Sequence, residues 1–401
     1  MKDSYQVLIV GGGAAGLSVA ARLLLDEPTL DIAIVEPSEK HYYQPIWTLV
    51  GAGVFDREIS ERDEADFIPD GAEWIKDRVT ALDPDSNQVT LGSGKTVSYQ
   101  FLVLCPGIQI DWHKIDGLVD TLGKNGVSSN YSYDTVSYTW EVLDGLKGGR
   151  AIFTSTPTAL KCGGAPQKIL YLAADHLRRK GVLPRTDVQF MNPGTMVFGV
   201  EHFARTLRKV IARYGIQFNL NTELIGVRGA EQKATFRVTN PADGSKSEKT
   251  LDFDMLHVTP HQSAPDFIKK SPVANADGWI DVKRETLQHV RYPEIFGLGD
   301  ASSVPVAKTG AAVRKQAPVA AANLLQVLRD GSLHAPKLYD GYTSCPLVTG
   351  YGKLVLAEFD WDNKPMPSFP FDTSQERYSM YALKLYVLPD LYWHGMLRGR
   401  V

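Results

Sequence analysis

A glycine-rich turn near the start of the chain limits the possible folds more than any other feature of the sequence. The run Gly11-Gly12-Gly13-Ala14-Ala15-Gly16 has the spacing G-x-G-x-x-G, and it joins a hydrophobic stretch, Tyr5–Val10, to an alanine- and leucine-rich stretch, Ala14–Leu25. Between a strand and a helix, this pattern is typical of dinucleotide binding. The first glycine allows a tight turn, the second lets the backbone approach a pyrophosphate, and the third lets the helix pack against the strand.

An acidic residue at the end of the next strand supports the same prediction. Asp31–Val35 forms a second hydrophobic strand, and Glu36-Pro37 follows it, 20 residues after Gly16. A carboxylate at this place hydrogen-bonds the ribose hydroxyls of a bound dinucleotide. We therefore expect the pyrophosphate at the N-terminus of the first helix and the ribose beside Glu36 and Pro37. A purely structural glycine-rich turn is the alternative.

The order of the remaining segments predicts an α/β fold with two Rossmann-like domains, the second inserted in the first. Short strands and turns between Arg78 and Leu104 form a meander, and a second alternation of helices and strands follows it. The expected boundaries are 1–110 for the first part of the dinucleotide-binding domain, 111–280 for the second Rossmann-like domain, 281–345 for the second part of the first domain, and 346–401 for a C-terminal segment.

A downstream segment favours FAD as the dinucleotide. The segment Ile295-Phe-Gly-Leu-Gly-Asp300 resembles the second FAD-binding sequence of the flavoproteins with two dinucleotide domains, in which a strand ends in Gly-Asp. The resemblance implies that Asp300 bonds the ribityl chain and that the next helix begins opposite the flavin. Gly107, after the strand Phe101–Leu104, is expected at the same site. A strand and turn with an aspartate that caps a helix is the alternative for Asp300.

The expected second domain lacks the glycines of a second dinucleotide site. Its strand Val188–Met191 is followed by Asn192-Pro-Gly-Thr-Met-Val-Phe-Gly199, so bulky side chains stand where glycines would let a pyrophosphate approach. Asn219 and Asn221 stand after the next strand in place of a well-placed acid. The sequence therefore disfavours NADH or NADPH as the reductant.

Two of the three cysteines have surroundings that suit redox chemistry, and three cysteines are too few for a secreted disulfide scaffold. Cys162 precedes a predicted helix and follows Lys161, and both features should lower the pKa of its thiol. Cys345 lies in what we expect to be a loop after the first domain. Neither lies in an apolar stripe, and we predict that the fold brings both toward the flavin, although each could be a buried structural cysteine. Cys105 is expected to pack in the core.

These cysteine segments resemble a known family. Lys161-Cys-Gly-Gly-Ala-Pro-Gln-Lys168 and Tyr339-Asp-Gly-Tyr-Thr-Ser-Cys-Pro-Leu-Val-Thr-Gly-Tyr351 are similar to sulfide:quinone oxidoreductases of the branch that bacteria and animal mitochondria share. Short segments of the tail, between 357 and 399, resemble the same family. One departure is Cys105-Pro106, where the family usually has an Ala-Thr or Ala-Leu type of pair before the glycine.

The resemblance implies a mechanism. Cys162 and Cys345 would form a disulfide beside the flavin, and hydrosulfide would attack it to leave a persulfide on Cys345 and a thiolate on Cys162. Two electrons would pass to FAD and then to ubiquinone or menaquinone, and sulfite, glutathione or another thiol would take the sulfane sulfur. Lys308-Thr309 resembles a pair that contacts the flavin, where a cation would stabilise the reduced form. A solvated loop lysine is the alternative. Glu201 and His202 are either proton-transfer residues or surface residues.

The C-terminal tail predicts attachment to a membrane surface. Residues 378–401 are rich in tyrosine, tryptophan, leucine and methionine, and Pro389 should split them into two amphipathic pieces that are each too short to span a membrane. Packing on the first domain or at a dimer interface is the alternative. Because no signal peptide precedes the first strand, we expect the cytoplasmic face of a bacterial inner membrane, or the mitochondrial inner membrane for a mature chain.

Composition and missing motifs argue against several other functions for this chain. The net charge of −3 gives no electrostatic footprint for nucleic acid, and we expect no metal site. A type II NADH:quinone oxidoreductase would need the second glycine-rich loop and would not need Cys162 and Cys345. A flavocytochrome sulfide dehydrogenase would share the cysteines but would need a haem partner, and the chain has no C-x-x-C-H. A flavin-bearing redox sensor is the alternative outside the enzymes.

Overall fold

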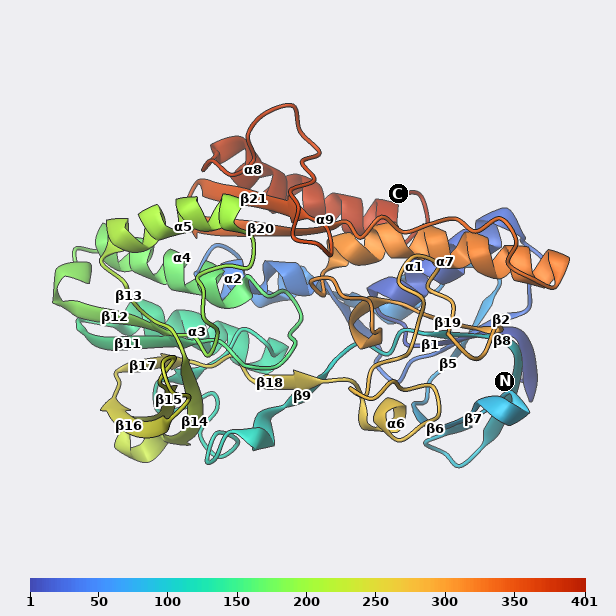
Figure 1. The fold of residues 1–401 in the computed structure, drawn as a ribbon, viewed down its shortest axis with the longest axis horizontal. Coiled ribbons are helices and arrows are strands. Elements are labelled where there is room, and N and C mark those ends of the chain that lie inside the picture. Colours follow the sequence, from blue (N-terminus) through green and yellow to red (C-terminus); the bar gives the residue numbers. More distant parts are fainter.

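The computed structural model describes residues 1–401 and has two αβ halves joined by a pair of short strands (Figure 1). The first half is built on a mixed sheet in the order β5-β2-β1-β8-β7-β6, with β19 also paired to β8. Its strands are β1 (Ser4–Val10), β2 (Ile32–Val35), β5 (Ala72–Ile75), β6 (Val79–Asp83), β7 (Gln88–Leu91), β8 (Thr96–Leu104) and β19 (Ile295–Gly297). The core of the sheet, from β5 to β19, is parallel, and the β6–β7–β8 meander is antiparallel, as predicted.

Two long helices cover one face of this sheet. They are α1 (Ala14–Asp26) and α7 (Gly310–Asp330), and they pack against each other. The interval between β2 and β5 holds the short elements β3 (Lys40–Tyr42), α2 (Trp47–Val50) and β4 (Glu61–Asp63). Because β1 and α1 are joined by the glycine turn, that turn lies at the carboxyl end of the parallel strands, where open α/β sheets bind their ligands.

The second half has a parallel sheet in the order β10-β17-β11-β12-β13. Its strands and helices are β10 (Val127–Ser128), α3 (Tyr133–Gly145), β11 (Gly149–Thr154), α4 (Ala165–Arg179), β12 (Thr186–Met191), α5 (Glu201–Tyr214), β13 (Gln217–Asn219) and β17 (Met255–His257). An antiparallel sheet follows β13, with β14 (Thr222–Arg228), β15 (Lys233–Thr239) and β16 (Lys246–Asp252). This confirms the fold class of two Rossmann-like domains.

The chain enters the second half through β9 (Gln109–Asp111) and returns through β18 (His261–Ser263), and these strands pair with each other. The short helix α6 (Asp266–Lys269) follows β18. The inserted second domain is therefore connected to the first domain through one pair of antiparallel strands. The boundaries 1–110, 111–280, 281–345 and 346–401 stay predictions.

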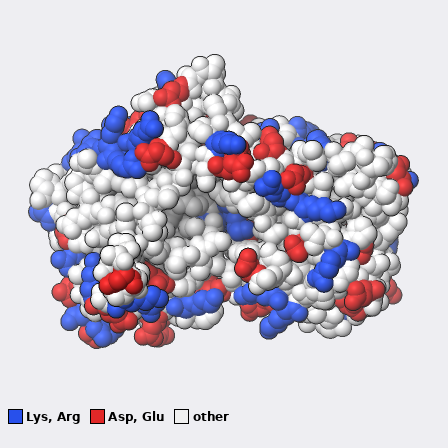
Figure 2. Space-filling view, viewed as in Figure 1, with Lys and Arg blue, Asp and Glu red and all other residues white.

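The C-terminal segment lies across both halves (red in Figure 1). Its hairpin, β20 (Thr343–Gly350) and β21 (Lys353–Phe359), packs on α4, and a helical run then extends toward α1 and α7. Figure 2 shows the same face hollowed near the middle, between the two halves. The segment thus joins the two domains over that hollow.

The helical run differs from the prediction at Pro389. It continues from Tyr378 to Met396 as α8 (Tyr378–Ala382), a π-helical segment (Leu383–Val387), α9 (Leu388–Asp390) and a second π-helical segment (Leu391–Met396). The expected split was wrong: Pro389 lies in the first turn of α9, where a missing N–H is tolerated, and the helical run continues on both sides of it. No helix in the chain has the combination of length and apolar character that a membrane crossing requires.

Candidate functional site

The glycine turn has the backbone that dinucleotide binding requires. Gly11 has a φ of +105°, and its N–H donates to the Val35 carbonyl at 3.0 Å. A side chain on Gly16 would overlap the Gly11 carbonyl oxygen, so only glycine lets α1 lie this close to the strand. Gly13 precedes α1 with no side-chain cap, and a Cβ there would meet no atom within 4 Å. The open space at this helix N-terminus suits a pyrophosphate.

Acceptor groups flank the turn. The Glu36 carboxylate accepts the backbone N–H groups of Gly12 and Ser38, each at 2.8 Å, which fixes it beside the glycine turn. Ala14 and Ala15 are the first residues of α1, and Pro37 is exposed after Glu36. In the loop after the neighbouring strand β8, Gly107 has a φ of +75° and open space at its Cβ position.

Asp300, Lys308 and Thr309 line one small cavity at the start of α7. Burial raises the pKa of Asp300, although the cations of Lys308 and Lys161 oppose this. Burial also lowers the pKa of Lys308 to about 8, and its Nζ lies 4.1 Å from the centre of the Trp279 ring. Thr309 caps α7, because its Oγ1 accepts the Ala312 N–H at 3.1 Å. The solvated-lysine alternative for Lys308 was therefore wrong. With the glycine turn, these polar groups fit FAD.

The Cys162 turn is tied to this cavity. The N–H of Cys162 donates to the Lys308 carbonyl at 2.7 Å, and Cys162 has a left-handed φ of +53°. Gly164 ends the turn at the N-terminus of α4, and a Cβ on Gly164 would collide with the Cys345 sulfur. Without side chains, Gly163 and Gly164 could leave room for a planar ring or a substrate. At Gly164 the room is instead filled by the second sulfur.

For Cys345, two expectations were wrong: that it lies in a loop, and that it lies outside the apolar core. It lies in strand β20, not in a loop, and it is 3% exposed within the main hydrophobic core, while Cys162 packs against that core. The pattern Thr-Ser-Cys-Pro hid the strand because its residues favour turns. The two thiols nevertheless meet, and the Cys345 thiol donates a hydrogen bond to the Cys162 sulfur.

A buried lysine that the sequence reasoning missed sits beside the thiol pair. Lys168 is 1% exposed, and its Nζ lies 3.1 Å from the Cys162 sulfur. The hydrogen bond from Cys345, together with the Lys168 ammonium, holds the pKa of Cys162 well below its ordinary value in spite of burial. The same hydrogen bond and burial raise the pKa of Cys345. The first thiolate of the pair therefore forms on Cys162.

Lys161, which the sequence favoured for this role, points elsewhere. Its Nζ donates to the Gln44 side chain at 2.6 Å and lies over the Trp47 ring. Helix geometry could have indicated Lys168. This residue lies in the first turn of α4, and helical side chains tilt toward the N-terminus of their helix, which here lies beside Cys162.

The tail supplies a second buried cation. Lys384 is 3% exposed, and its Nζ donates to the Pro45 carbonyl at 2.9 Å. Burial and the neighbouring Lys168 ammonium lower the pKa of Lys384 to about 7, while the sulfurs of Cys162 and Cys345 oppose that shift. No sequence pattern indicates a role for this residue, which reaches the sulfurs only through the fold of the tail.

Other candidate residues lie away from the thiol pair. Cys105 is buried at the end of β8, as predicted for a packing residue, and its Sγ lies 3.6 Å from the Gly11 carbonyl oxygen. Glu201 pairs with Arg208 on the surface of α5, and His202 is also exposed there, 3.6 Å from Asp372. Of the two alternatives for Glu201 and His202, the structure supports surface residues.

The loop after β12 is shaped by side chains. The Asn192 side chain accepts the Gly194 N–H at 3.1 Å and donates to the Met196 carbonyl at 3.0 Å. The Gln167 side chain donates to the Val197 carbonyl at 2.6 Å. These contacts hold residues 192–200 in a long loop of bends before α5. This loop does not resemble the tight glycine turn before α1.

The fold and the site define a class: a flavoprotein with two dinucleotide-type domains and a pair of neighbouring thiols, Cys345 buried and Cys162 half-buried. The family model for pyridine nucleotide-disulphide oxidoreductases matches residues 5–139. The chain is also 45% identical to the mitochondrial sulfide:quinone oxidoreductases of Mus musculus and Dictyostelium discoideum, over 99% and 100% of this chain and 87% of each relative. The chain belongs to the sulfide:quinone oxidoreductase family, and it is an FAD-binding enzyme.

Solved structures agree with the fold. The sulfide:quinone oxidoreductase of Aquifex aeolicus superposes with a TM-score of 0.79 at 19% identity, over 99% of this chain and 92% of that one. NDH2 from Plasmodium falciparum superposes with a TM-score of 0.70 at 11% identity, over 100% of this chain and 97% of that one. The shared fold explains why a type II NADH:quinone oxidoreductase was the nearest rival, and the similarity in sequence decides against it.

Proposed function

We propose that this chain oxidises sulfide and passes the electrons to a quinone, with Cys162 and Cys345 as its catalytic residues. The observation that carries the proposal is the contact of two thiols, far apart in sequence, beside the cavity of Asp300 and Lys308. A pair of neighbouring thiols in which the half-buried sulfur, Cys162, has the low pKa suits thiol–disulfide exchange.

In the first step, hydrosulfide attacks the Cys345 sulfur of a Cys162–Cys345 disulfide. The new S–S bond makes a persulfide on Cys345, and the old S–S bond breaks with its electron pair on Cys162. The Lys168 ammonium, 3.1 Å from that sulfur, stabilises the thiolate that leaves. Lys384 adds a second positive charge when it is protonated, because it faces the same sulfurs. The persulfide then gives its outer sulfur to sulfite, glutathione or another thiol.

Bound FAD would accept two electrons when the two cysteines are joined again and would deliver them to the quinone. The cysteines would join as a disulfide once the acceptor has taken the outer sulfur or, with no acceptor present, through a bridge that keeps the added sulfur between Cys162 and Cys345. The residues that would hold it are Gly11, Gly13, Ala14, Ala15, Gly16, Glu36, Pro37, Gly107, Asp300, Lys308 and Thr309. Gly13 and the start of α1 bind the pyrophosphate, and Glu36 accepts from the ribose. Lys308 supplies positive charge at the flavin end, where reduction adds negative charge.

An anaerobic flavin titration with sulfide and, separately, with NADH tests this function. Sulfide should bleach the oxidised flavin band and NADH should not. With a quinone analogue present, the flavin should then cycle. Bleaching by NADH alone would restore the NADH:quinone rival, and a single reduction by sulfide without turnover would indicate a redox sensor.

We also propose that the chain is a peripheral membrane protein that meets the inner membrane, on the cytoplasmic face in a bacterium, through the tail. Tyr392 and Trp393 pack inward against His41 and Phe67 of the first half, whereas Tyr378 and Tyr386 are about 70% exposed. Aromatic side chains exposed in this way suit the headgroup region of a bilayer. The packed face makes deletion of the tail a poor test, because deletion would open the core.

Point substitutions test the membrane proposal. Tyr378→Glu with Tyr386→Glu should reduce sedimentation with lipid vesicles and reduction of a long-chain quinone, with FAD content unchanged. Leu338→Glu, at a side chain that is 61% exposed outside the tail, is the matched control and should change neither. Full sedimentation of the tyrosine variant would refute the membrane role of the tail.

A further inference from the structure

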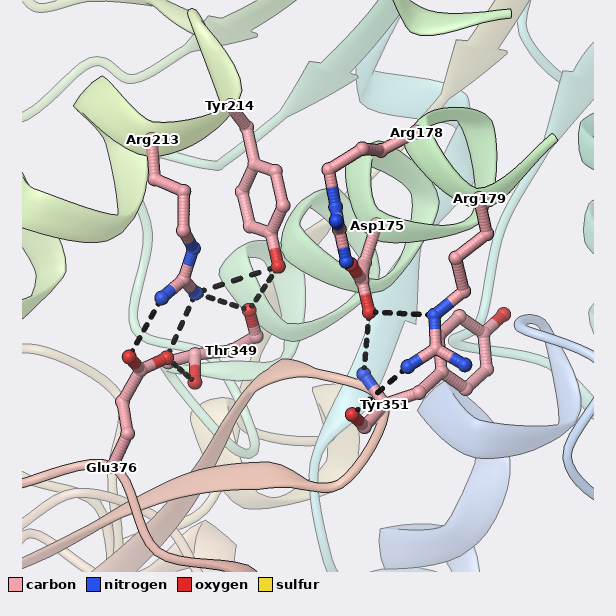
Figure 3. Close-up of polar contacts among 8 residues, drawn as sticks. All are labelled: Asp175, Arg178, Arg179, Arg213, Tyr214, Thr349, Tyr351 and Glu376. Atoms are coloured by element: carbon pink, nitrogen blue, oxygen red, sulfur yellow. Dashed lines mark hydrogen bonds and ion pairs between the residues drawn. The ribbon is translucent and has the colours of Figure 1, made fainter. Parts of the chain in front are cut away.

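The hairpin that carries Cys345 is held to the second half by two polar clusters at the end opposite the cysteine (Figure 3). In the first, Asp175 near the end of α4 is 2% exposed and accepts the N–H of Tyr351 at 2.9 Å. Arg178 and Arg179 both pair with this carboxylate. Arg179 also donates to the Tyr351 carbonyl at 3.2 Å. The hairpin turn is therefore bound through its backbone and not through a replaceable side chain.

The second cluster holds the last residues of β20. Arg213 of α5 makes a two-pronged ion pair with Glu376, at 2.7 and 2.8 Å, and Glu376 accepts the Thr349 hydroxyl. Arg213 and the Tyr214 hydroxyl both donate to the Thr349 carbonyl, at 3.1 and 3.0 Å. Figure 3 shows that the two clusters lie on either side of the same strand end. Together they connect α4, α5 and the hairpin.

These clusters add polar contacts to a hairpin that otherwise depends on its apolar packing against α4. β20 and β21 form a sheet of only two strands, and an isolated two-stranded hairpin is marginally stable. One end of α4 touches the Cys345 sulfur at Gly164, and the other end binds Tyr351 through Asp175. The helix between these residues is about 17 Å long, and the strand from Cys345 to Tyr351 spans about 20 Å. Helix and strand are therefore matched in length and pinned at both ends.

The register of β20 decides whether the sulfurs can meet. A slip by one residue turns each side chain to the other face of the strand, so Cys345 would leave α4 and a neighbour would take its place. We propose that Asp175 and Glu376 are positioning residues for the sulfur chemistry. They hold β20 in the register that brings the Cys345 sulfur onto Cys162. This inference rests on the proposed function, and it names residues that contact neither sulfur.

The equilibrium of the cysteine pair with glutathione tests the inference. In this exchange the two thiols become a disulfide, and oxidised glutathione takes their electrons and protons to become two molecules of reduced glutathione. The equilibrium constant reports how well the sulfurs are held together. In the holoenzyme, Asp175→Asn and Glu376→Gln should each lower the constant roughly tenfold, the scale of one lost charge-assisted hydrogen bond. Reduction of the flavin by sulfide should slow in parallel.

A matched variant separates positioning from stability. Asp187 accepts Arg150 at 2.9 Å and the side chains of Gln189 and Gln217 at 2.6 and 2.8 Å, in the same half but away from the hairpin. Asp187→Asn should lower Tm and leave the glutathione equilibrium unchanged. If Asp175→Asn and Glu376→Gln also lower Tm alone, the positioning role is overturned. Glu376 is 22% exposed, so its variant keeps the test available if Asp175→Asn does not fold.

The two proposals fail in different ways. If sulfide still bleaches the flavin of Cys162→Ser, the sulfur mechanism is wrong, whatever the glutathione equilibrium shows. If the mechanism stands and the equilibrium constants of Asp175→Asn and Glu376→Gln equal that of the wild-type chain, only the positioning role is wrong.

Discussion

Replacement of Lys168 by methionine should raise the pKa of Cys162. The Lys168 ammonium is buried and lies 3.1 Å from the Cys162 sulfur. Two unit charges at this distance attract by about 5 kcal/mol at an effective dielectric constant of about 20. Because the ammonium also loses its hydration, the net contribution should be that of a charged hydrogen bond, about 1.5–3 kcal/mol. This corresponds to a rise of roughly 1–2 units in the pKa of Cys162.

Lys384 should offset part of this change. The charge of Lys168 helps to lower the pKa of Lys384 to about 7, so removal of Lys168 should let Lys384 stay protonated at higher pH. The larger shift is therefore expected in the double variant Lys168→Met with Lys384→Met.

The rate of alkylation of Cys162 by iodoacetamide measures the thiolate. In the reduced holoenzyme under anaerobic conditions, the pH at which the alkylation rate reaches half its maximum should be higher in Lys168→Met than in the wild-type chain. Lys168→Arg should restore most of the wild-type profile because it keeps the charge. Lys161→Met is the matched control, since Lys161 donates to Gln44, and it should shift the midpoint less. Superimposable profiles for Lys168→Met and the wild-type chain would refute the role of Lys168.

Three further predictions follow from other contacts. Gly164→Ala should push the Cys345 sulfur away from Cys162 and slow flavin reduction by sulfide while FAD stays bound; an unchanged rate in stopped-flow absorbance would contradict the packing. Gly16→Ala should cost roughly 1–3 kcal/mol of stability and lower the FAD content, and full flavin content with an unchanged Tm would contradict this. Burial lowers the pKa of Lys384 to about 7 from 10.5, so the unfolded chain binds more protons in that window and this residue makes stability rise with pH there. Lys384→Met should flatten the slope in denaturant titrations, and an unchanged slope would contradict the buried position.

The sequence was sufficient for the first domain because the dinucleotide turn is local. Its glycines, the strand before it and the acid after the next strand all lie within the first 36 residues. Each glycine is needed for one stated feature of the backbone: the tight turn, the approach of the pyrophosphate, or the packing of helix on strand. The insertion of the second domain was also predictable, since the FAD-type segment ending at Asp300 returns far downstream.

The sulfur site was only partly predictable because its parts come from three distant segments. The strand around Cys345 was read as a loop, since its local residues favour turns and only pairing with β21 makes it a strand. Lys161 is visible in the sequence as the neighbour of Cys162, whereas the direction of a side chain, which brings Lys168 to the sulfur, is not. Lys384 reaches the sulfurs through a helical run that continues past Pro389, and no local pattern indicates that path.

The most direct measurement is mass spectrometry of the peptides from enzyme treated with sulfide under anaerobic conditions, combined with the flavin absorbance of the same sample. We predict one added sulfur atom retained between the Cys162 and Cys345 peptides, none on the Cys105 peptide, and loss of the oxidised flavin band. Cys162→Ser and Cys345→Ser should each keep the flavin oxidised. A flavin that sulfide reduces in both variants would contradict a reaction that runs through these two sulfurs.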